Sequence, residues 1–216
     1  MSNIEWKPIA NDSKNYFKGS LNGNGHKIKG LSITKNNEEN GLFGYFAGTV
    51  SNLTIEGSII ISIDGDKYSY NGGFAGFSKD ATFENCTNNV EIDTLMLNST
   101  QATYVYGGGI SGWLTSSTVS NCQNNARIMS VSYEGTRSDA VAGGICGTMG
   151  YSTITDCKNT SEILAKAITT SDKYMVLSYA GGIVGSSSDG KVSNCVNTGK
   201  IHASAFADQK TAYTSI

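Results

Sequence analysis

Gly108-Gly109-Ile110-Ser111-Gly112 and, a few residues later, Asn121-Cys122-Gln123-Asn124 form a unit that the chain repeats. Further copies of the first part occupy residues 72–76, 143–147 and 181–185, and a divergent copy occupies residues 40–44. In each full copy a cysteine stands thirteen residues after the second glycine, and an isoleucine stands six residues after that cysteine. Self-similarity at a period of 32 to 38 residues indicates a repeat architecture.

Each unit has the composition of short strands rather than helices. The 216 residues include 26 glycines and a single proline, and only 16% are charged. Within one unit we expect three strands: residues 104–106 run into the Gly-Gly pair, residues 118–122 carry the cysteine, and residues 127–131 follow it. Glycine is expected to supply the positive φ angles and the close backbone approach at the corners.

These features predict an all-β fold, a parallel β-solenoid similar to a right-handed β-helix, with about five repeats. We expect one domain over residues 1–216: an N-terminal cap and lead-in coil at 1–40, five repeats at 41–202, and a C-terminal edge at 203–216 without an obvious capping helix. A β-propeller is the main architectural alternative. Its blades usually run about 40–50 residues, which is longer than most of the units in this chain.

Stacked units would place equivalent residues in columns, with neighbouring coils about 4.8 Å apart. Leu31 and Leu53 would join one apolar column with Cys86, Cys122, Cys157 and Cys195. A second apolar column would hold Ile28, Val50, Phe83, Val119, Ile154 and Val192. Amide columns would flank the cysteines, with Asn52, Asn85, Asn121, Asp156 and Asn194 before them and Asn88, Asn124, Asn159 and Asn197 after them. A column of alternating charge would hold Glu91, Arg127, Glu162 and Lys200.

The repeated residues resemble a known family. The start Gly41-Leu42-Phe43-Gly44, the four Gly-Gly-φ-x-Gly copies and the Asn-Cys-x-Asn echoes are similar to the GLUG-repeat family. The stretch from Trp6 to Ile33 resembles the segment that precedes such repeats, so the resemblance covers residues 6–202. It implies a bacterial surface or secreted protein, as in adhesins and in the non-catalytic regions of immunoglobulin-A-cleaving metalloproteases. A resemblance of fold does not by itself assign an activity.

The net charge and the lack of long apolar runs argue against two kinds of partner, nucleic acid and the membrane interior. The net charge of −2 offers no broad basic face, so nucleic acid is not expected as a partner. No run of about 18 uncharged apolar residues exists, so we expect no membrane insertion. The first six residues lack the pattern of a secretion signal, so we expect either a cytosolic protein or a signal that lies outside this sequence. An extracellular or cell-surface location is therefore expected from the resemblance alone.

No cluster of residues predicts catalysis, a cofactor or a metal. A column of four cysteines would extend roughly 14 Å, too far to converge on zinc at about 2.3 Å per ligand. The parallel cysteines are expected to be buried thiols rather than disulfides. Asp64-Gly65-Asp66 supplies too few ligands for calcium. Cys146 is expected to be a packing residue, and the two histidines, His26 and His202, lie at opposite ends of the stack.

Aromatic residues near the Gly-Gly pair are the candidate ligand contacts. Flat aromatic faces can bind sugars or proteins, and this set comprises Tyr68, Tyr70, Tyr104, Tyr106, Trp113 and Tyr179. In the alternative interpretation, Tyr70, Tyr106, Val141 and Tyr179 form an inward column. The long insertions 93–103, 132–139 and 165–175 are a second place where a binding surface could lie.

The resulting hypothesis is a non-catalytic structural or adhesive module that presents loops on a rigid rod. Its expected partner is a host or bacterial surface protein or a glycan. The alternative is a carbohydrate-binding or polysaccharide-degrading β-helix protein. Exposed end coils would also allow end-to-end stacking on a neighbouring domain or chain.

Overall fold

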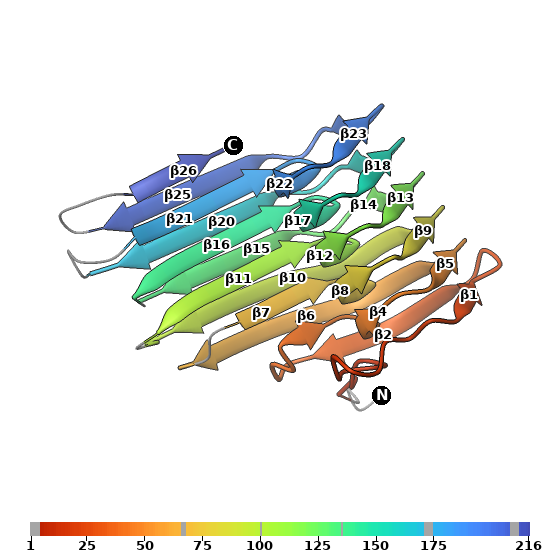
Figure 1. The fold of residues 1–216 in the computed structure, drawn as a ribbon, viewed down its shortest axis with the longest axis horizontal. Coiled ribbons are helices and arrows are strands. Elements are labelled where there is room, and N and C mark those ends of the chain that lie inside the picture. Colours follow the sequence, from red (N-terminus) through yellow and green to blue (C-terminus); the bar gives the residue numbers. More distant parts are fainter. Residues whose placement is uncertain (1–4, 66–67, 100, 135, 171–174, 208–211) are drawn as a thin grey trace.

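The chain folds into a β-solenoid made only of strands and connecting turns (Figure 1). The structure, a computed structural model, describes residues 5–65, 68–99, 101–134, 136–170, 175–207 and 212–216. Every strand pair in these ranges is parallel, and the paired strands come from successive repeats. The predicted all-β solenoid of stacked parallel coils is therefore confirmed.

Each full coil contributes to four sheets, which we name I to IV in chain order from the tyrosine-rich strands. Sheet I contains β3 (Glu39–Asn40), β7 (Tyr68–Gly72), β11 (Ala102–Gly108), β16 (Arg137–Gly143), β21 (Met175–Gly181) and β26 (Ala212–Ser215). Sheet II contains β4 (Phe43–Phe46), β8 (Ala75–Lys79), β12 (Ser111–Thr115), β17 (Cys146–Gly150) and β22 (Val184–Ser188).

The other two sheets complete the coil. Sheet III contains β1 (Ser20–Asn22), β5 (Thr49–Ser51), β9 (Thr82–Glu84), β13 (Thr118–Ser120), β18 (Thr153–Thr155) and β23 (Lys191–Ser193). Sheet IV begins with the long strands β2 (Lys27–Ile33), β6 (Thr54–Asp64) and β10 (Thr87–Leu97). Its later coils each contribute two strands: β14 (Gln123–Asn124) and β15 (Ile128–Tyr133), β19 (Lys158–Asn159) and β20 (Ile163–Thr169), and β24 (Val196–Asn197) and β25 (Ile201–Ala207).

The prediction of three strands per unit missed sheet II. The residues after the Gly-Gly pair, such as those of β12, form a strand of their own. The cysteine lies beyond the strand that was expected to carry it, because β13 ends at Ser120 and Cys122 occupies the corner before sheet IV. The short, glycine-rich sequence of β12 carries little strand signal by itself, and its pairing with β8 and β17 makes it a strand.

The corner before the cysteine is built by asparagine and aspartate rather than by glycine. At this corner φ lies between 50° and 53° in every repeat, at Asn52, Asn85, Asn121, Asp156 and Asn194. This left-handed conformation costs most other L-residues roughly 1–2 kcal/mol. The expectation that the Gly-Gly pairs supply positive φ is wrong, since the positive-φ glycines of the described chain are Gly25, Gly30, Gly57 and Gly65.

The other half of that expectation, close backbone approach, is confirmed at the Gly-Gly pairs. A Cβ atom on Gly109 would lie 2.7 Å from Cγ and Oδ1 of Asn124 and would overlap the carbonyl oxygen of Gly144. The amide of Asn124 is buried in a ladder in which Nδ2 of Asn88 donates to Oδ1 of Asn124 at 2.8 Å, and Nδ2 of Asn124 donates to Oδ1 of Asn159 at 2.7 Å. The Gly-Gly segment and the Asn-Cys-x-Asn segment of a repeat therefore pack directly against each other.

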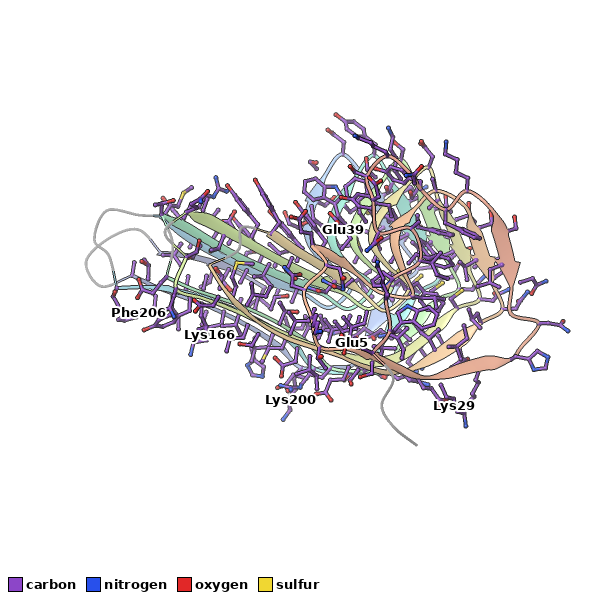
Figure 2. The ribbon with its side chains drawn as sticks, turned by 90° about the horizontal axis from the view of Figure 1, so that it is seen from below. Glu5, Lys29, Glu39, Lys166, Lys200 and Phe206 are labelled. Carbon is purple, nitrogen blue, oxygen red and sulfur yellow. The ribbon has the colours of Figure 1, made fainter. Side chains whose placement is uncertain are left out.

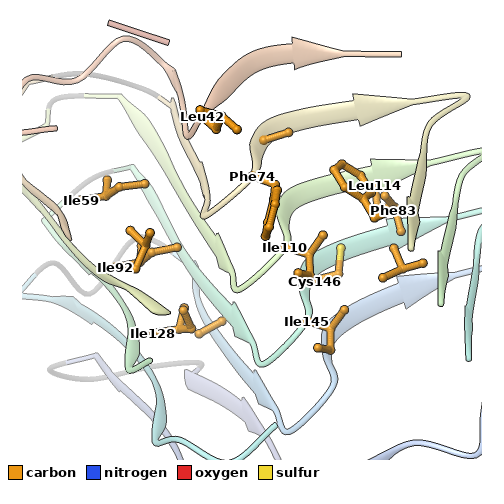
Figure 3. Close-up of a cluster of buried hydrophobic side chains, with 14 of the residues drawn as sticks. Leu42, Ile59, Phe74, Phe83, Ile92, Ile110, Leu114, Ile128, Ile145 and Cys146 are labelled. Atoms are coloured by element: carbon orange, nitrogen blue, oxygen red, sulfur yellow. The ribbon is translucent and has the colours of Figure 1, made fainter. Parts of the chain in front are cut away.

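The core consists of residue columns that follow the stack (Figure 3). The register of β10, β14, β19 and β24 places Cys86, Cys122, Cys157 and Cys195 on successive coils, as predicted. All five cysteines are free thiols. The isoleucine column is also confirmed, since Ile59, Ile92, Ile128, Ile163 and Ile201 pair in register. Cys146 lies in the column of Phe43, Ala75, Ser111 and Val184, where it is buried.

The predicted alignment of the lead-in coil is wrong. Leu21, not Ile28, pairs with Val50, while Ile28 pairs with Ile55. Leu31 pairs with Gly57 and so lies outside the cysteine column. The expected alignment began too late in the chain, because β1 already pairs with β5 from Ser20 onward. The residues after the corner at Asn24 and Gly25 pair along β6 instead, with a register shift between Lys29 and Leu31.

The charged column on the outer face of sheet IV forms in part as predicted. Arg127 donates through Nε and Nη2 to Oε1 of Glu91 at 3.1 and 2.9 Å, and its Nη2 also lies 3.1 Å from Asp93. Glu162 pairs with the imidazole of His202 at 3.4 Å. These groups are substantially exposed, so each pair contributes at most about 1 kcal/mol.

Sheets I and IV pack face to face beyond the main core and make a thin two-layer extension. Figure 2 looks along the stack and shows Lys166 and Lys200 projecting outward from sheet IV. The buried side chains between the two layers are mostly small, among them Thr103, Ser132, Ala140, Ala165 and Ala167. Thr103 and Ser132 share a hydrogen bond of 2.5 Å between their hydroxyl oxygens. Small side chains allow the close spacing of the two layers.

Candidate functional site

The candidate aromatic residues lie on the outer surface of the solenoid. In β11 the buried positions are Thr103 and Val105, whereas Tyr104 and Tyr106 alternate with them and are half-buried on the outer side. The alternative of an inward tyrosine column is therefore wrong. A strict alternation of period two would give Tyr106 the same direction as the buried Ile110, but the corner at residues 109–110 separates two strands and breaks that alternation.

Four tyrosines, which we name the tyrosine ladder, stack across β7 and β11. Tyr68 lies over Tyr104 with ring centroids 5.1 Å apart and planes 8° from parallel. Tyr70 lies over Tyr106 at 5.2 Å and 3°. Parallel register fixes these pairs, because each tyrosine of β7 is directly opposite its equivalent in β11. Cross-strand aromatic pairs of this kind stabilise a sheet by up to about 1 kcal/mol each.

Sheet II supplies a second aromatic row next to the ladder. The ring of Trp113 meets Tyr70 and Tyr106 edge-on at centroid distances of 5.6 and 5.7 Å. Phe77 lies 5.9 Å from Trp113 on the preceding coil. We name Tyr68, Tyr70, Tyr104, Tyr106, Phe77 and Trp113 the aromatic face. It is a continuous surface that spans the angle between sheets I and II.

Tyr45 and Tyr16 extend this surface toward the N-terminus, and they were missed from the sequence. Tyr45 precedes Phe77 and Trp113 in the same register column, and Tyr16 packs against it at 5.2 Å. The signal was present in the repeat, since Tyr45, Phe77 and Trp113 each follow the last glycine of their motif copy. Tyr16 lies in the lead-in coil and has no equivalent in the repeats.

A buried carboxyl closes the N-terminal end of this surface. Glu39 is 5% exposed, and the hydroxyl of Tyr45 donates a hydrogen bond to it. Burial raises the pKa of Glu39 to about 7, which the hydrogen bond from Tyr45 partly opposes. Figure 2 shows Glu39 in the angle between the sheets. This carboxyl is therefore neutral in part of the molecules near neutral pH.

The aromatic surface stops at the coil of β16 and β17. Three outward positions change there at once: Asp139, Val141 and Thr148 take the places of Tyr104, Tyr106 and Trp113. Tyr179 restores an aromatic ring on the next coil and is therefore separated from the other candidates. The result is a hollow of about 240 Å³, lined by Tyr106, Arg137, Asp139, Val141, Thr148, Leu177, Tyr179 and Ser186.

An ion pair forms one side of the hollow. Nε and Nη2 of Arg137 donate to the carboxylate of Asp139 at 2.8 to 3.0 Å. The guanidinium carbon also lies 5.6 Å from the ring centroid of Tyr104, a cation–π distance. Burial raises the pKa of Asp139, while Arg137 acts in the opposite direction. Two contacts therefore fix the guanidinium next to the aromatic face.

The insertions proposed as loops are largely strands. Residues 93–97 continue β10, residues 132–133 and 137–139 belong to β15 and β16, and residues 165–169 continue β20. Thr100, Gly135 and residues 171–174 of these insertions fall outside the described residues, as does Asp66 of the Asp64-Gly65-Asp66 motif considered for calcium. Among the described residues, no group of three or more His, Cys, Asp or Glu side chains could hold a metal ion.

The described residues also contain no apolar helix of the length that a membrane crossing requires.

Comparison with known proteins identifies the motif of the last repeat. Residues 177–201 match the GLUG motif, which confirms the resemblance noted in the repeated residues. Halomucin from Haloquadratum walsbyi (strain DSM 16790 / HBSQ001) is 43% identical over 58 residues. That alignment covers 26% of this chain and 1% of halomucin, so this chain spans about a hundredth of that relative. No solved structure matches the chain.

Proposed function

We propose that this chain is a non-catalytic structural and adhesive module of a bacterial cell-surface or secreted protein, and that the aromatic face is its contact surface. The observation that carries the proposal is the tyrosine ladder itself. Four rings stack in register on the outside of a rigid parallel stack, with Tyr68 40% exposed. A soluble protein rarely leaves a contiguous aromatic surface without a partner.

The GLUG motif and the similarity to halomucin support the repeat-module part of the proposal. The same likeness supports a surface location. Stacked coils suit this role because each coil adds the same rise, so a contact surface stays at a fixed place on the rod.

Polysaccharide cleavage is not the function that the carboxyl groups support. Glu39 and Asp139 are the buried carboxyls beside the aromatic surface, and they lie three coils apart in sheet I. Three coil spacings amount to about 14 Å, whereas paired catalytic carboxyls of glycosidases are about 5–9.5 Å apart. Arg137 also holds Asp139 in an ion pair.

Bead adhesion tests this proposal. Beads coated with the chain are passed over bacterial cells and over mucin-coated glass, and the number retained under flow is counted. Replacing Tyr68 and Tyr104 by serine should lower retention about tenfold, since stacking surfaces of this size are worth on the order of 1 kcal/mol each.

Ile60→Ser is the matched control, because Ile60 is 52% exposed on the opposite face, in sheet IV. This variant should be retained like the original chain. If beads carrying the unaltered chain are retained no better than bare beads on either surface, the adhesive function is wrong.

A further inference from the structure

The column that runs from Tyr70 to Tyr179 lacks one ring. Tyr70, Tyr106, Val141 and Tyr179 are directly opposite one another on successive strands. Coils are about 4.8 Å apart, so the backbones of Tyr106 and Tyr179 are about 9.6 Å apart across Val141. Where both positions are aromatic, as at Tyr70 and Tyr106, the rings face each other at 5.2 Å. A six-membered ring placed over Val141 would therefore face Tyr106 on one side and Tyr179 on the other.

The hollow at this position has an apolar base. Val141 and Leu177 are 3% and 9% exposed and form its floor on sheet I. Trp113 meets the ring of Tyr106 edge-on from sheet II, so one wall of the hollow is held in place by packing. This base would accept a ligand through apolar contact and ring stacking.

Polar groups stand at the edge of the same hollow. Asp139 offers carboxylate oxygens, and Arg137 binds it through Nε and Nη2, while Nη1 of Arg137 has no partner within the described part of the chain. Thr148 also lines the hollow, although its Oγ1 is shielded from solvent there.

We propose that this hollow binds one pyranose ring of a neutral glycan, sandwiched between Tyr106 and Tyr179 over Val141. The proposal rests on the proposed adhesive function and names its ligand class and site. A pyranose has apolar C–H groups on its faces and hydroxyls around its edge. The faces match the two tyrosine rings, and the hydroxyls match Asp139 and Arg137.

Charge and edge chemistry select this occupant over the alternatives. Arg137 is neutralised by Asp139 at 2.8 Å, so the site holds no unpaired positive charge for a uronic or sialic acid. An aromatic side chain would stack equally well but has too few donors at its edge for the carboxylate of Asp139.

Calorimetric titration of the full chain with cellohexaose, mannohexaose and chitohexaose tests the proposal. At least one hexasaccharide should bind. Val141→Tyr supplies the missing ring from the protein and should weaken that binding at least tenfold, which is about 1.4 kcal/mol. Tyr179→Ala and Asp139→Asn should each weaken it several-fold, and they keep the test informative if the larger tyrosine at position 141 perturbs the fold.

Ile60→Ser is the matched control here too, because Ile60 is exposed on sheet IV and does not line the hollow. Its affinity should equal that of the original chain. Equal affinity of Val141→Tyr, in a variant with an unchanged urea midpoint, would overturn the site. Failure of all three hexasaccharides would overturn the pyranose assignment, and binding of N-acetyl-tryptophanamide in their place would identify an aromatic side chain as the occupant. The bead experiment decides the adhesive function separately, because retention that survives Val141→Tyr leaves that function standing without this site.

Discussion

In three of the coils, two asparagines that lie three residues apart have different physical roles. Asn121 is exposed and adopts the left-handed conformation that turns the chain from sheet III toward sheet IV. Asn124 is buried, donates to the backbone oxygen of Ala126 and to Asn159, and accepts from Asn88. The first role depends on the backbone and the second on the amide group. Substitutions should therefore separate the two roles.

Replacing Asn121 by valine should lower the free energy of unfolding by roughly 1–2 kcal/mol, because a β-branched residue is strained at a φ of 50°. Asn121→Gly should be close to neutral, since glycine adopts this conformation without steric cost. Urea unfolding followed by circular dichroism measures both. Equal loss in the two variants would mean that the exposed amide, not the backbone conformation, matters at this corner.

At the scale of strands, the corner between sheets I and II accepts only glycine at two positions, because an added Cβ would clash with neighbouring coils. The backbones of β11 and β12 turn so tightly that the second glycine packs on the asparagine ladder. The third glycine has the same constraint, since a Cβ on Gly112 would lie 2.6 Å from the backbone nitrogen of Asn71. Close contact with neighbouring coils therefore fixes these glycines, even though their φ angles are ordinary.

Gly109→Ala should destabilise the protein by about 1–3 kcal/mol or more, the usual cost of overpacking. Gly150 provides the control, because its nearest neighbours to an added Cβ are atoms of Ser188 at 3.6 Å and its φ is not positive. Gly150→Ala should unfold at the same urea concentration as the original chain or slightly higher. A comparable loss in both variants would show that close packing at the Gly-Gly corner is not the cause.

The short strands β3 and β4 hold the buried carboxyl of Glu39 next to Tyr45. Its folded pKa, about 7, is higher than its ordinary value of 4.5. A raised carboxyl pKa stabilises the fold below the ordinary value, and this contribution is lost as pH rises through the folded value. Stability should therefore fall between about pH 4.5 and pH 7 for this reason.

Glu39→Gln should remove this part of the pH dependence, since an amide stays neutral and still accepts from Tyr45. The original chain should lose up to about 3 kcal/mol more than the variant between about pH 5 and about pH 8. Urea unfolding at the two pH values gives the difference directly. The same pH dependence in both proteins would mean that Glu39 ionises normally in the fold.

On the scale of the whole molecule, each coil contacts only its neighbours, so stability should vary along the stack. Ile154 and Val119 are fully buried, whereas Val192, their equivalent in the last coil, is 45% exposed. The strands β22 to β25 bond to a coil on one side only. The last coil should therefore open more readily than the rest.

Hydrogen exchange followed by mass spectrometry should show a gradient. Amides of β10 to β13 should exchange slowest, and those of β22 to β25 should exchange at least tenfold faster, because local opening of an end coil exposes fewer buried contacts. Uniform exchange over all coils would show that the stack unfolds as a single cooperative unit.

The sequence alone established the parallel stack and the columns of cysteine and isoleucine. Equivalent residues such as Cys122 and Cys157 occur at fixed distances from the Gly-Gly pair, and only in-register stacking gives all of them the same surroundings. The candidate tyrosines were also identified from their position before that pair, and all six candidate aromatic residues proved to lie on the outer side of sheets I and II.

The tertiary structure alone decided which way those tyrosines face and where the aromatic surface is interrupted. In a continuous strand, alternation shows which side chains point inward and which outward. The corner at residues 109–110 interrupts that alternation, so the sequence does not show which way Tyr106 points. The hollow over Val141 is made by residues of three coils, about seventy positions apart in the chain. Segments of unequal length separate these residues, so only the pairing of the strands brings Tyr106 and Tyr179 to opposite sides of the same space.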